Sequence, residues 1–204
     1  KADPSKVLQR KADSDRIYAM VDVANGQSGD ERNKTLAEVD KVANALQWVS
    51  DPYKGHGLVA MAMAKKLRGD KAGALNLLKE YGADLRAIDK AMEEQGVEID
   101  NPLAAARLFV GQCHQEDGQA LLKSGKKDEA KKAFGLALTE YINTFRKYGK
   151  DDAGKKAGIL YTELGAVVKK EFGVDVAPVS NSTLANPNST TTVQIARTML
   201  DLAD

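Results

Sequence analysis

Residue types that commonly carry out chemistry in proteins are few in this 204-residue chain, which has one cysteine, Cys113, and two histidines, His56 and His114. Cys113 and His114 are adjacent, so on a helix their side chains diverge by about 100° and do not form a nucleophile with its base. A single cysteine excludes an internal disulfide and a cysteine-based zinc site. His114 and Asp117 share a helical face, but two ligands do not make a metal site.

The paired acidic residues and the glycine-flanked stretches have simple structural interpretations. Asp151 and Asp152 begin a predicted helix, where carboxylates are favoured by unpaired amide groups and by the helix dipole. The glycine-flanked stretches at 25–29 and 55–57 lack the preceding strand that a phosphate-binding loop requires. We therefore expect no catalytic residue, no metal site and no cofactor.

Charge and hydropathy exclude two further classes of partner. The net charge is +1, which supplies no global field for holding nucleic acid. No run of about 18 apolar residues is present, so we expect no transmembrane segment.

Residues 123–171 hold twelve basic and seven acidic residues, a local surplus of +5. This surplus is typical of a solvated surface, with a face for an acidic peptide as the alternative.

The elements that must position these residues are predicted to be helices. The chain contains 29 Ala and 20 Leu with only 5% aromatic residues, a composition that favours helices over strands. An Asx residue precedes Pro4, Pro52 and Pro102, which indicates three helix starts. Helical spacing of the apolar residues then predicts helices over about 4–24, 31–49, 52–68, 70–94, 102–124, 127–148 and 152–172.

The composition changes near the C-terminal end. Residues 177–192 contain two prolines and no charged residue, which is typical of a linker. Apolar residues at helical spacing return after that point. We therefore predict a helical domain over 1–174, a linker over 175–192 and a C-terminal helix over 193–204. This helix would cap the helical stack or dock on a partner.

Two stretches 56 residues apart share one pattern, in which a turn glycine is followed by a small alanine and then by a bulky apolar residue. The small residue lets the second helix of a hairpin pack closely on the first, and the bulky residue fills the space beside it. The pattern consists of Gly69, Ala74 and Leu78 in one stretch and of Gly125, Ala130 and Phe134 in the other.

These residues, with Gly118, Leu121 and Ala137, fall at the spacings of the tetratricopeptide repeat. Residues 111–144 match one repeat, and residues 55–88 match a second, which departs from the pattern at Lys65 and Tyr81. The chain thus resembles tetratricopeptide-repeat proteins. The resemblance implies an all-α fold of antiparallel hairpins, stacked as a short solenoid of about seven helices plus a C-terminal helix.

The junction that starts at Phe145 is similar to one in bacterial envelope tetratricopeptide proteins, such as the outer-membrane assembly lipoprotein and the cell-division coordinator family. Tyr148, Ala153 and Ala157 fit that junction, whereas Gly149 stands where the family has proline. The similarity implies a bacterial protein, with a periplasmic or envelope-associated location favoured over a cytoplasmic one.

In tetratricopeptide proteins the first helix of each hairpin lines a concave groove, so the resemblance also implies which residues contact a partner. Three glutamines that share one helical face would form a polar stripe able to hydrogen-bond an extended peptide, or else an ordinary wet helix face. The implied groove residues are Gln112, Gln115, Gln119, Leu122 and Lys123 in one repeat, and His56, Met63 and Lys66 in the other.

The expected function is a non-enzymatic interaction module or scaffold that captures a peptide or a partner helix in a helix-lined groove. Two alternatives stay open: a small-molecule-binding or regulatory helical domain, and a helical fragment of a larger enzyme. The sequence specifies neither the partner nor the oligomeric state.

Overall fold

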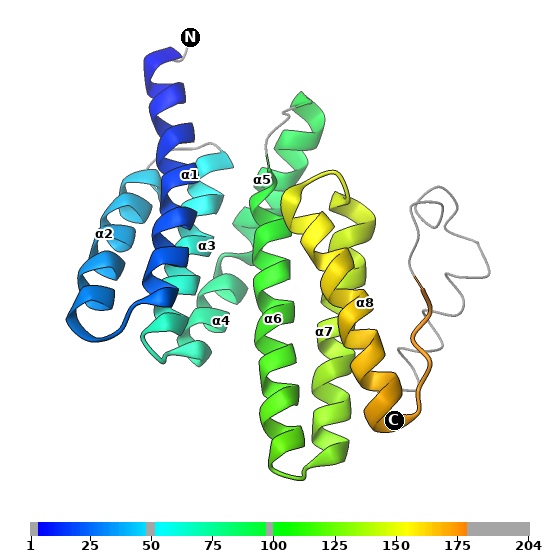
Figure 1. The fold of residues 1–204 in the computed structure, drawn as a ribbon. Helices are drawn as coiled ribbons and strands as arrows, with labels where there is room; N and C mark the ends of the chain where they lie inside the picture. The colour runs from blue at the N-terminus through cyan, green and yellow to red at the C-terminus, as the bar shows by residue number, and fades with distance from the viewer. Residues whose placement is uncertain (1–3, 48–51, 97–99, 179–204) are drawn as a thin grey trace. The chain divides into compact units, whose positions relative to one another are not determined.

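The computed structural model describes residues 4–47, 52–96 and 100–178, and these residues form eight α-helices with no strand among them (Figure 1). The predicted linker lies outside the described residues from position 179 onward, and so does the whole of the predicted C-terminal helix over 193–204. The helices are α1 (Pro4–Gly26), α2 (Gly29–Gln47), α3 (Pro52–Leu67), α4 (Lys71–Glu80), α5 (Gly82–Gln95), α6 (Pro102–Lys123), α7 (Lys127–Tyr148) and α8 (Asp152–Phe172).

The predicted fourth helix over 70–94 is wrong in one respect, because it is two helices that meet at Tyr81. Tyr81 is the C-cap of α4 and the N-cap of α5, and its amide still donates to the carbonyl of Leu77. Gly82 then begins α5, and glycine is a poor helix former that favours a break at this point. The apolar spacing runs unchanged through the break, so periodicity alone predicts one helix.

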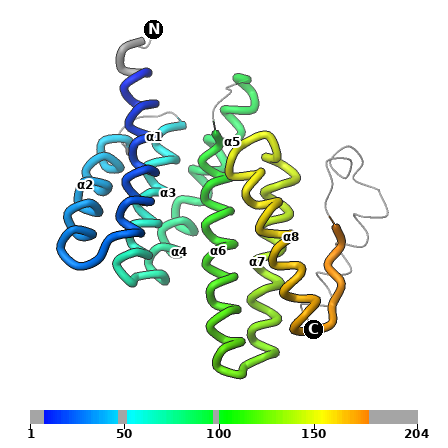
Figure 2. Tube along the Cα trace, viewed as in Figure 1, coloured from blue at the N-terminus to red at the C-terminus, as the bar shows by residue number. Residues whose placement is uncertain are grey.

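The chain divides into two compact units, Lys1–Ala106 and Arg107–Asp204, and the division falls within α6. In the first unit, α3 packs against α1, α2, α4 and α5, and α1 to α3 lie side by side (Figure 2). Ile17, Leu36, Val39 and Ala60 are fully buried in the core that these helices share. The first unit is therefore organised around α3.

Glycines in α3 allow this close packing. A Cβ atom on Gly57 would lie 2.9 Å from the carbonyl oxygen of Ala43, and one on Gly55 would lie 2.5 Å from a ring carbon of Pro102. Only a residue without a side chain fits at either position. The stretch at 55–57 is thus a helix-packing element of the first unit.

Both predicted turn glycines are confirmed. Gly69 and Gly125 have φ values of 89° and 79°, in the left-handed region that favours glycine. At each turn the amide of the residue after the glycine donates a hydrogen bond to the carbonyl five residues earlier. Asp70 donates to Lys65, and Lys126 donates to Leu121. The two helix ends therefore close with the same geometry.

In the second unit, α6 packs on α7 through glycine–aromatic contacts. A Cβ atom on Gly118 would lie 2.5 Å from ring carbons of Phe134, and one on Gly111 would lie 2.6 Å from a ring carbon of Tyr141. Ala130 is fully buried in the hydrophobic cluster that contains both aromatic rings. The helices can approach closely because glycine leaves room for the rings.

Helix α8 packs along α7 and contributes Tyr161, Leu164 and Val168 to the core of the second unit. It ends at Gly173, where φ is 71°. The chain then reverses, since Val176 lies against Gly165 and the Tyr161 hydroxyl donates to the carbonyl of Ala177 at 3.2 Å. Residues 174–177 therefore cover one side of α8.

Consecutive helices pack in pairs, which confirms the all-α class. Of the helices that the structure describes, none combines the length and the apolar character needed to cross a membrane.

Candidate functional site

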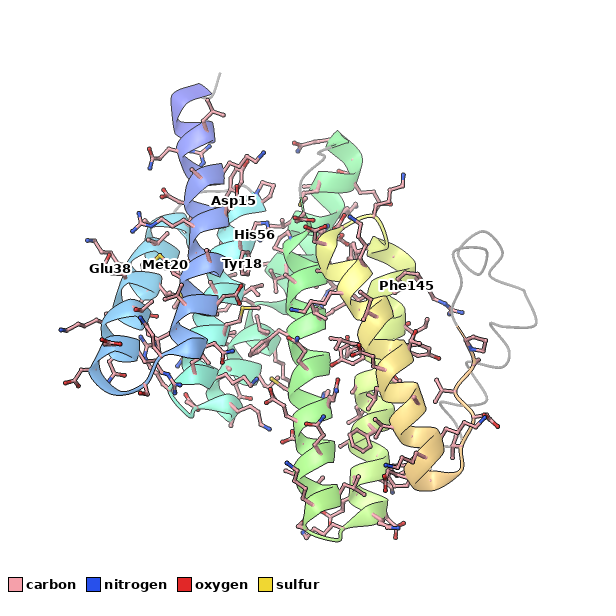
Figure 3. All side chains as sticks on the ribbon, viewed as in Figure 1. Asp15, Tyr18, Met20, Glu38, His56 and Phe145 are labelled. Atoms are coloured by element: carbon pink, nitrogen blue, oxygen red, sulfur yellow. The ribbon has the colours of Figure 1, made fainter. Side chains whose placement is uncertain are left out.

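His56 lies inside the first unit, where its side chain bridges two other parts of the chain (Figure 3). Its Nε2 is 2.9 Å from the carbonyl oxygen of Asp100, and its Nδ1 is 2.9 Å from the hydroxyl of Tyr18. A carbonyl only accepts, so Nε2 carries the proton and Tyr18 donates to Nδ1. This assigns the neutral Nε2–H form to a ring that is 5% exposed.

Burial determines the proton affinities of this pair. It lowers the pKa of His56 below its usual value, and the hydrogen bond to Asp100 and the charges of Asp100 and Asp15 oppose that shift without reversing it. Burial also raises the pKa of the Tyr18 hydroxyl, assisted by the charge of Asp100. Both side chains are therefore neutral at pH 7, and they join α1 to α3.

A second buried polar group closes the start of α6. Asn101 donates to the Asp89 carboxylate at 2.9 Å, and its own side-chain oxygen accepts the amide of Leu103 at 2.9 Å. The latter contact is a helix N-cap. The N-cap confirms the helix start that the Asn–Pro sequence predicts, and the bond to Asp89 also ties α5 to the first turn of α6.

The remaining residues singled out for chemistry do not assemble into a metal site. Cys113 is buried. Among the described residues, no group of three or more His, Cys, Asp or Glu side chains is placed to hold a metal ion.

The implied groove residues have different surroundings. Gln115 accepts the hydroxyl of the buried Tyr141 at 2.6 Å, so this glutamine is engaged with α7. Gln112 is half-buried, whereas Gln119 and Lys123 are exposed. Leu122 packs against the core of the second unit. The three glutamines therefore do not form a uniformly exposed stripe.

The groove residues implied on α3 belong to the first unit. His56 is buried with both ring nitrogens hydrogen-bonded, which leaves little of its ring for contact with a partner. Met63 packs against the core, and Lys66 is half-buried.

A surface depression of about 590 Å³ lies beside α8 in the second unit. The ring of Phe145 lies over Gly158, where a Cβ atom would be 2.7 Å from a ring carbon. The depression therefore has an apolar floor with charged residues at its edge. Its lining consists of Phe145, Gly149, Lys155, Gly158, Ile159, Thr162 and Glu163.

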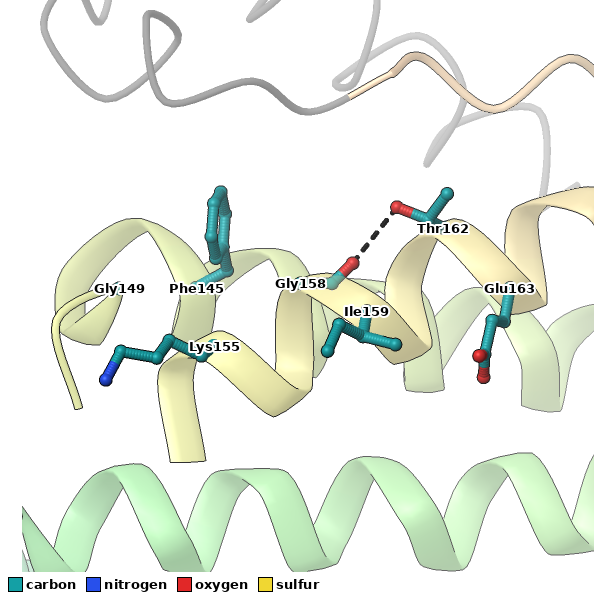
Figure 4. A pocket seen from close by; sticks show the side chains of 7 residues that line it. All are labelled: Phe145, Gly149, Lys155, Gly158, Ile159, Thr162 and Glu163. Carbon is teal, nitrogen blue, oxygen red and sulfur yellow. Dashed lines mark hydrogen bonds between the residues drawn. The ribbon is translucent and has the colours of Figure 1, made fainter. Parts of the chain in front are cut away.

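Three of these residues, Lys155, Ile159 and Glu163, follow one another at intervals of four on α8; we call them the α8 row. They project from one side of α8, whereas Thr162 of α8 and Phe145 of α7 project to another side (Figure 4). Ile159 is 60% exposed. The row is an apolar side chain between two exposed side chains of opposite charge.

The α8 row was not identified from the sequence, although a signal for it exists there. The buried face of α8 is formed by Ala157, Tyr161, Leu164 and Val168. Ile159 is two positions beyond Ala157, about 200° around the helix, so it lies off that face. An apolar residue outside the core stripe, flanked by opposite charges, could have indicated a contact surface.

No protein-family model matches this chain, and no curated protein or solved structure matches it either.

Proposed function

We propose that this protein is a non-enzymatic interaction module that binds a partner helix along the α8 row and the adjoining depression. The exposed Ile159 carries the proposal, because it lies beside an apolar floor and between Lys155 and Glu163. An apolar anchor with charged residues at its rim is the common arrangement of helix-binding surfaces.

The chemistry of the row defines what each residue contributes. Complete burial of an isoleucine side chain stabilises by about 1.5–3 kcal/mol, and more than half of this side chain is still exposed. Lys155 and Glu163 would contribute mainly orientation and specificity, because exposed ion pairs are individually weak. Ile159 is thus the affinity anchor, and the charges select the partner.

The tetratricopeptide-like arrangement belongs to the same proposal. It is supported by the matching turns at Gly69 and Gly125 and by the contact of Gly118 with Phe134. In that arrangement Gln119 and Lys123 on α6 form a second exposed surface for a partner. The burial of His56 and Cys113 favours binding over catalysis.

A peptide selection tests the proposal. Helix-forming peptides from a randomised library are selected on the immobilised protein, and their affinity is measured by fluorescence anisotropy with Ile159→Glu and Leu136→Glu variants. Leu136 is the matched control, since it is also an exposed apolar residue, 53% accessible, on α7. We expect Ile159→Glu to weaken binding at least about tenfold and Leu136→Glu to leave it unchanged.

Other outcomes overturn the assignment. If binding withstands Ile159→Glu but is lost on Gln119→Ala/Lys123→Glu, the partner contacts α6 and the α8 row is not the site. If no helical peptide is selected at all, the helix-binding function is wrong.

A further inference from the structure

The order of charges on the α8 row is self-complementary. Lys155 and Glu163 each lie four residues from Ile159, one on either side. When two identical helices pack antiparallel around a two-fold axis at Ile159, Lys155 of each copy faces Glu163 of the other copy. Within its own helix Lys155 also contacts the Asp152 carboxylate at 3.1 Å, and Glu163 of the other copy would join this exposed pair. The two ion pairs and the central apolar contact are then equivalent by symmetry.

The surface beside Ile159 suits a close approach of this kind. Gly158 and Thr162 are small, and they adjoin the depression floored by the Phe145 ring. The Thr162 hydroxyl donates to the carbonyl of Gly158 at 3.0 Å, so its polar atom is paired within the helix. The projecting isoleucine and the hollow therefore lie on adjoining sides of α8.

Another antiparallel register is disfavoured by charge. Val167 is the second large apolar residue exposed on α8, and pairing it with Ile159 of another copy would place the two-fold axis at Glu163. The two Glu163 carboxylates would then face each other, which is destabilising. That axis also places Lys155 opposite Glu171, whereas the axis at Ile159 combines apolar contact with opposite charges and brings no like charges of the row together.

We propose that the partner of the α8 row is a second copy of this chain, bound antiparallel with the two-fold axis at Ile159. This inference rests on the proposed function and specifies its partner. The 21 residues of α8 extend over about 31 Å, and one helix pair is a small interface. We therefore expect a reversible dimer with a dissociation constant in the micromolar range.

Charge exchange at the row tests the arrangement. The dissociation constant is measured by sedimentation equilibrium for the full chain and for Lys155→Glu, Glu163→Lys and the double variant. Each single change turns two attractive pairs into two repulsive ones, so we expect about five- to tenfold weaker dimerisation. The double variant restores the dimer, because the exchanged charges face each other again.

A mixture of the two single variants provides the sharper measurement. The Lys155→Glu chain is acidic at both positions of the row and the Glu163→Lys chain is basic at both, so we expect them to form a heterodimer preferentially. Ile159→Glu abolishes the dimer, and Leu136→Glu leaves it unchanged. Thermal melts of each variant confirm that the fold is intact.

Two results would overturn the dimer. The first is a chain that stays monomeric up to millimolar concentration. The second is a double variant that dimerises as weakly as the single variants, because this result excludes the axis at Ile159. If such a monomer still binds selected helical peptides through Ile159, the proposed function survives and only the identity of the partner is wrong.

Discussion

His56 has a hydrogen-bond partner at each ring nitrogen, and the loss of one partner has a defined consequence. In Tyr18→Phe the ring remains but the hydroxyl is lost, which leaves Nδ1 of His56 buried without its donor. We expect a loss of about 1–3 kcal/mol in the free energy of unfolding. Chemical denaturation measures the change.

The same substitution at Tyr81 is the control. Its hydroxyl makes no hydrogen bond within the part of the chain that the structure describes, and its side chain is half-buried. Equal losses for Tyr18→Phe and Tyr81→Phe would show that the Tyr18–His56 contact contributes nothing to stability.

The lowered pKa of His56 also predicts how stability changes with pH. The pKa is lower in the folded chain than the value of about 6.5 for an unfolded one, so the unfolded chain binds more protons in the interval between the two. The contribution of the neutral His56 ring to the free energy of unfolding is thus fully present above about pH 6.5. It is lost as the pH falls toward the pKa of His56 in the folded chain.

Denaturation midpoints between pH 7.5 and 5.5 measure this loss. His56→Gln should flatten the pH dependence, whereas His114→Gln, at the other histidine, should retain it. An unchanged slope in His56→Gln would show that other groups cause the pH dependence.

At the level of helices, the contact of Gly118 with Phe134 determines how closely α6 and α7 pack. Alanine is the better helix former by about 0.8–1 kcal/mol, yet its Cβ atom would lie 2.5 Å from the Phe134 ring. Overpacking of this kind destabilises by about 1–3 kcal/mol, so we expect Gly118→Ala to lower the melting temperature.

Gly82→Ala is the helix control. A Cβ atom at Gly82 would meet only the end of the Arg86 side chain, at 3.4 Å, an ordinary contact distance. This variant should be neutral or slightly stabilising. A stabilised Gly118→Ala would mean that the two helices do not pack as described.

At the scale of the whole molecule, the net charge of +1 determines how salt acts on self-association. Long-range repulsion between whole copies is small, but residues 123–171 carry a local surplus of +5, so added salt screens this repulsion as well as the attraction of the Lys155–Glu163 pairs. Raising ionic strength from 0.1 to 1 M shortens the screening length from about 10 to about 3 Å. We therefore expect added salt to weaken the proposed dimer relative to a variant that lacks the two charges of the row.

Sedimentation of the Lys155→Gln/Glu163→Gln variant separates the two contributions. Without the charges, only the apolar contact remains, so its dimerisation should not weaken with salt. Loss of the dimer in high salt for this variant as well would assign the effect to charges elsewhere on the molecule.

The amino-acid sequence by itself determined the helical class, most helix boundaries and the two glycine turns. These features depend on local chemistry: proline after an Asx residue at a helix start, glycine at a left-handed turn, and apolar residues at helical intervals. The break at Tyr81 was missed because Leu78 and Leu85 preserve the helical interval across it.

Only the tertiary structure decided which polar residues are buried and which apolar ones remain exposed. The tetratricopeptide resemblance implies groove positions for His56 and Gln115, yet Tyr18 and Tyr141, far away in the sequence, supply their hydrogen-bond partners. Ile159 reads as a core residue by type, but it lies off the buried face of α8 and stays exposed. Burial depends on the packing of helices distant in sequence, which spacing within one helix does not encode.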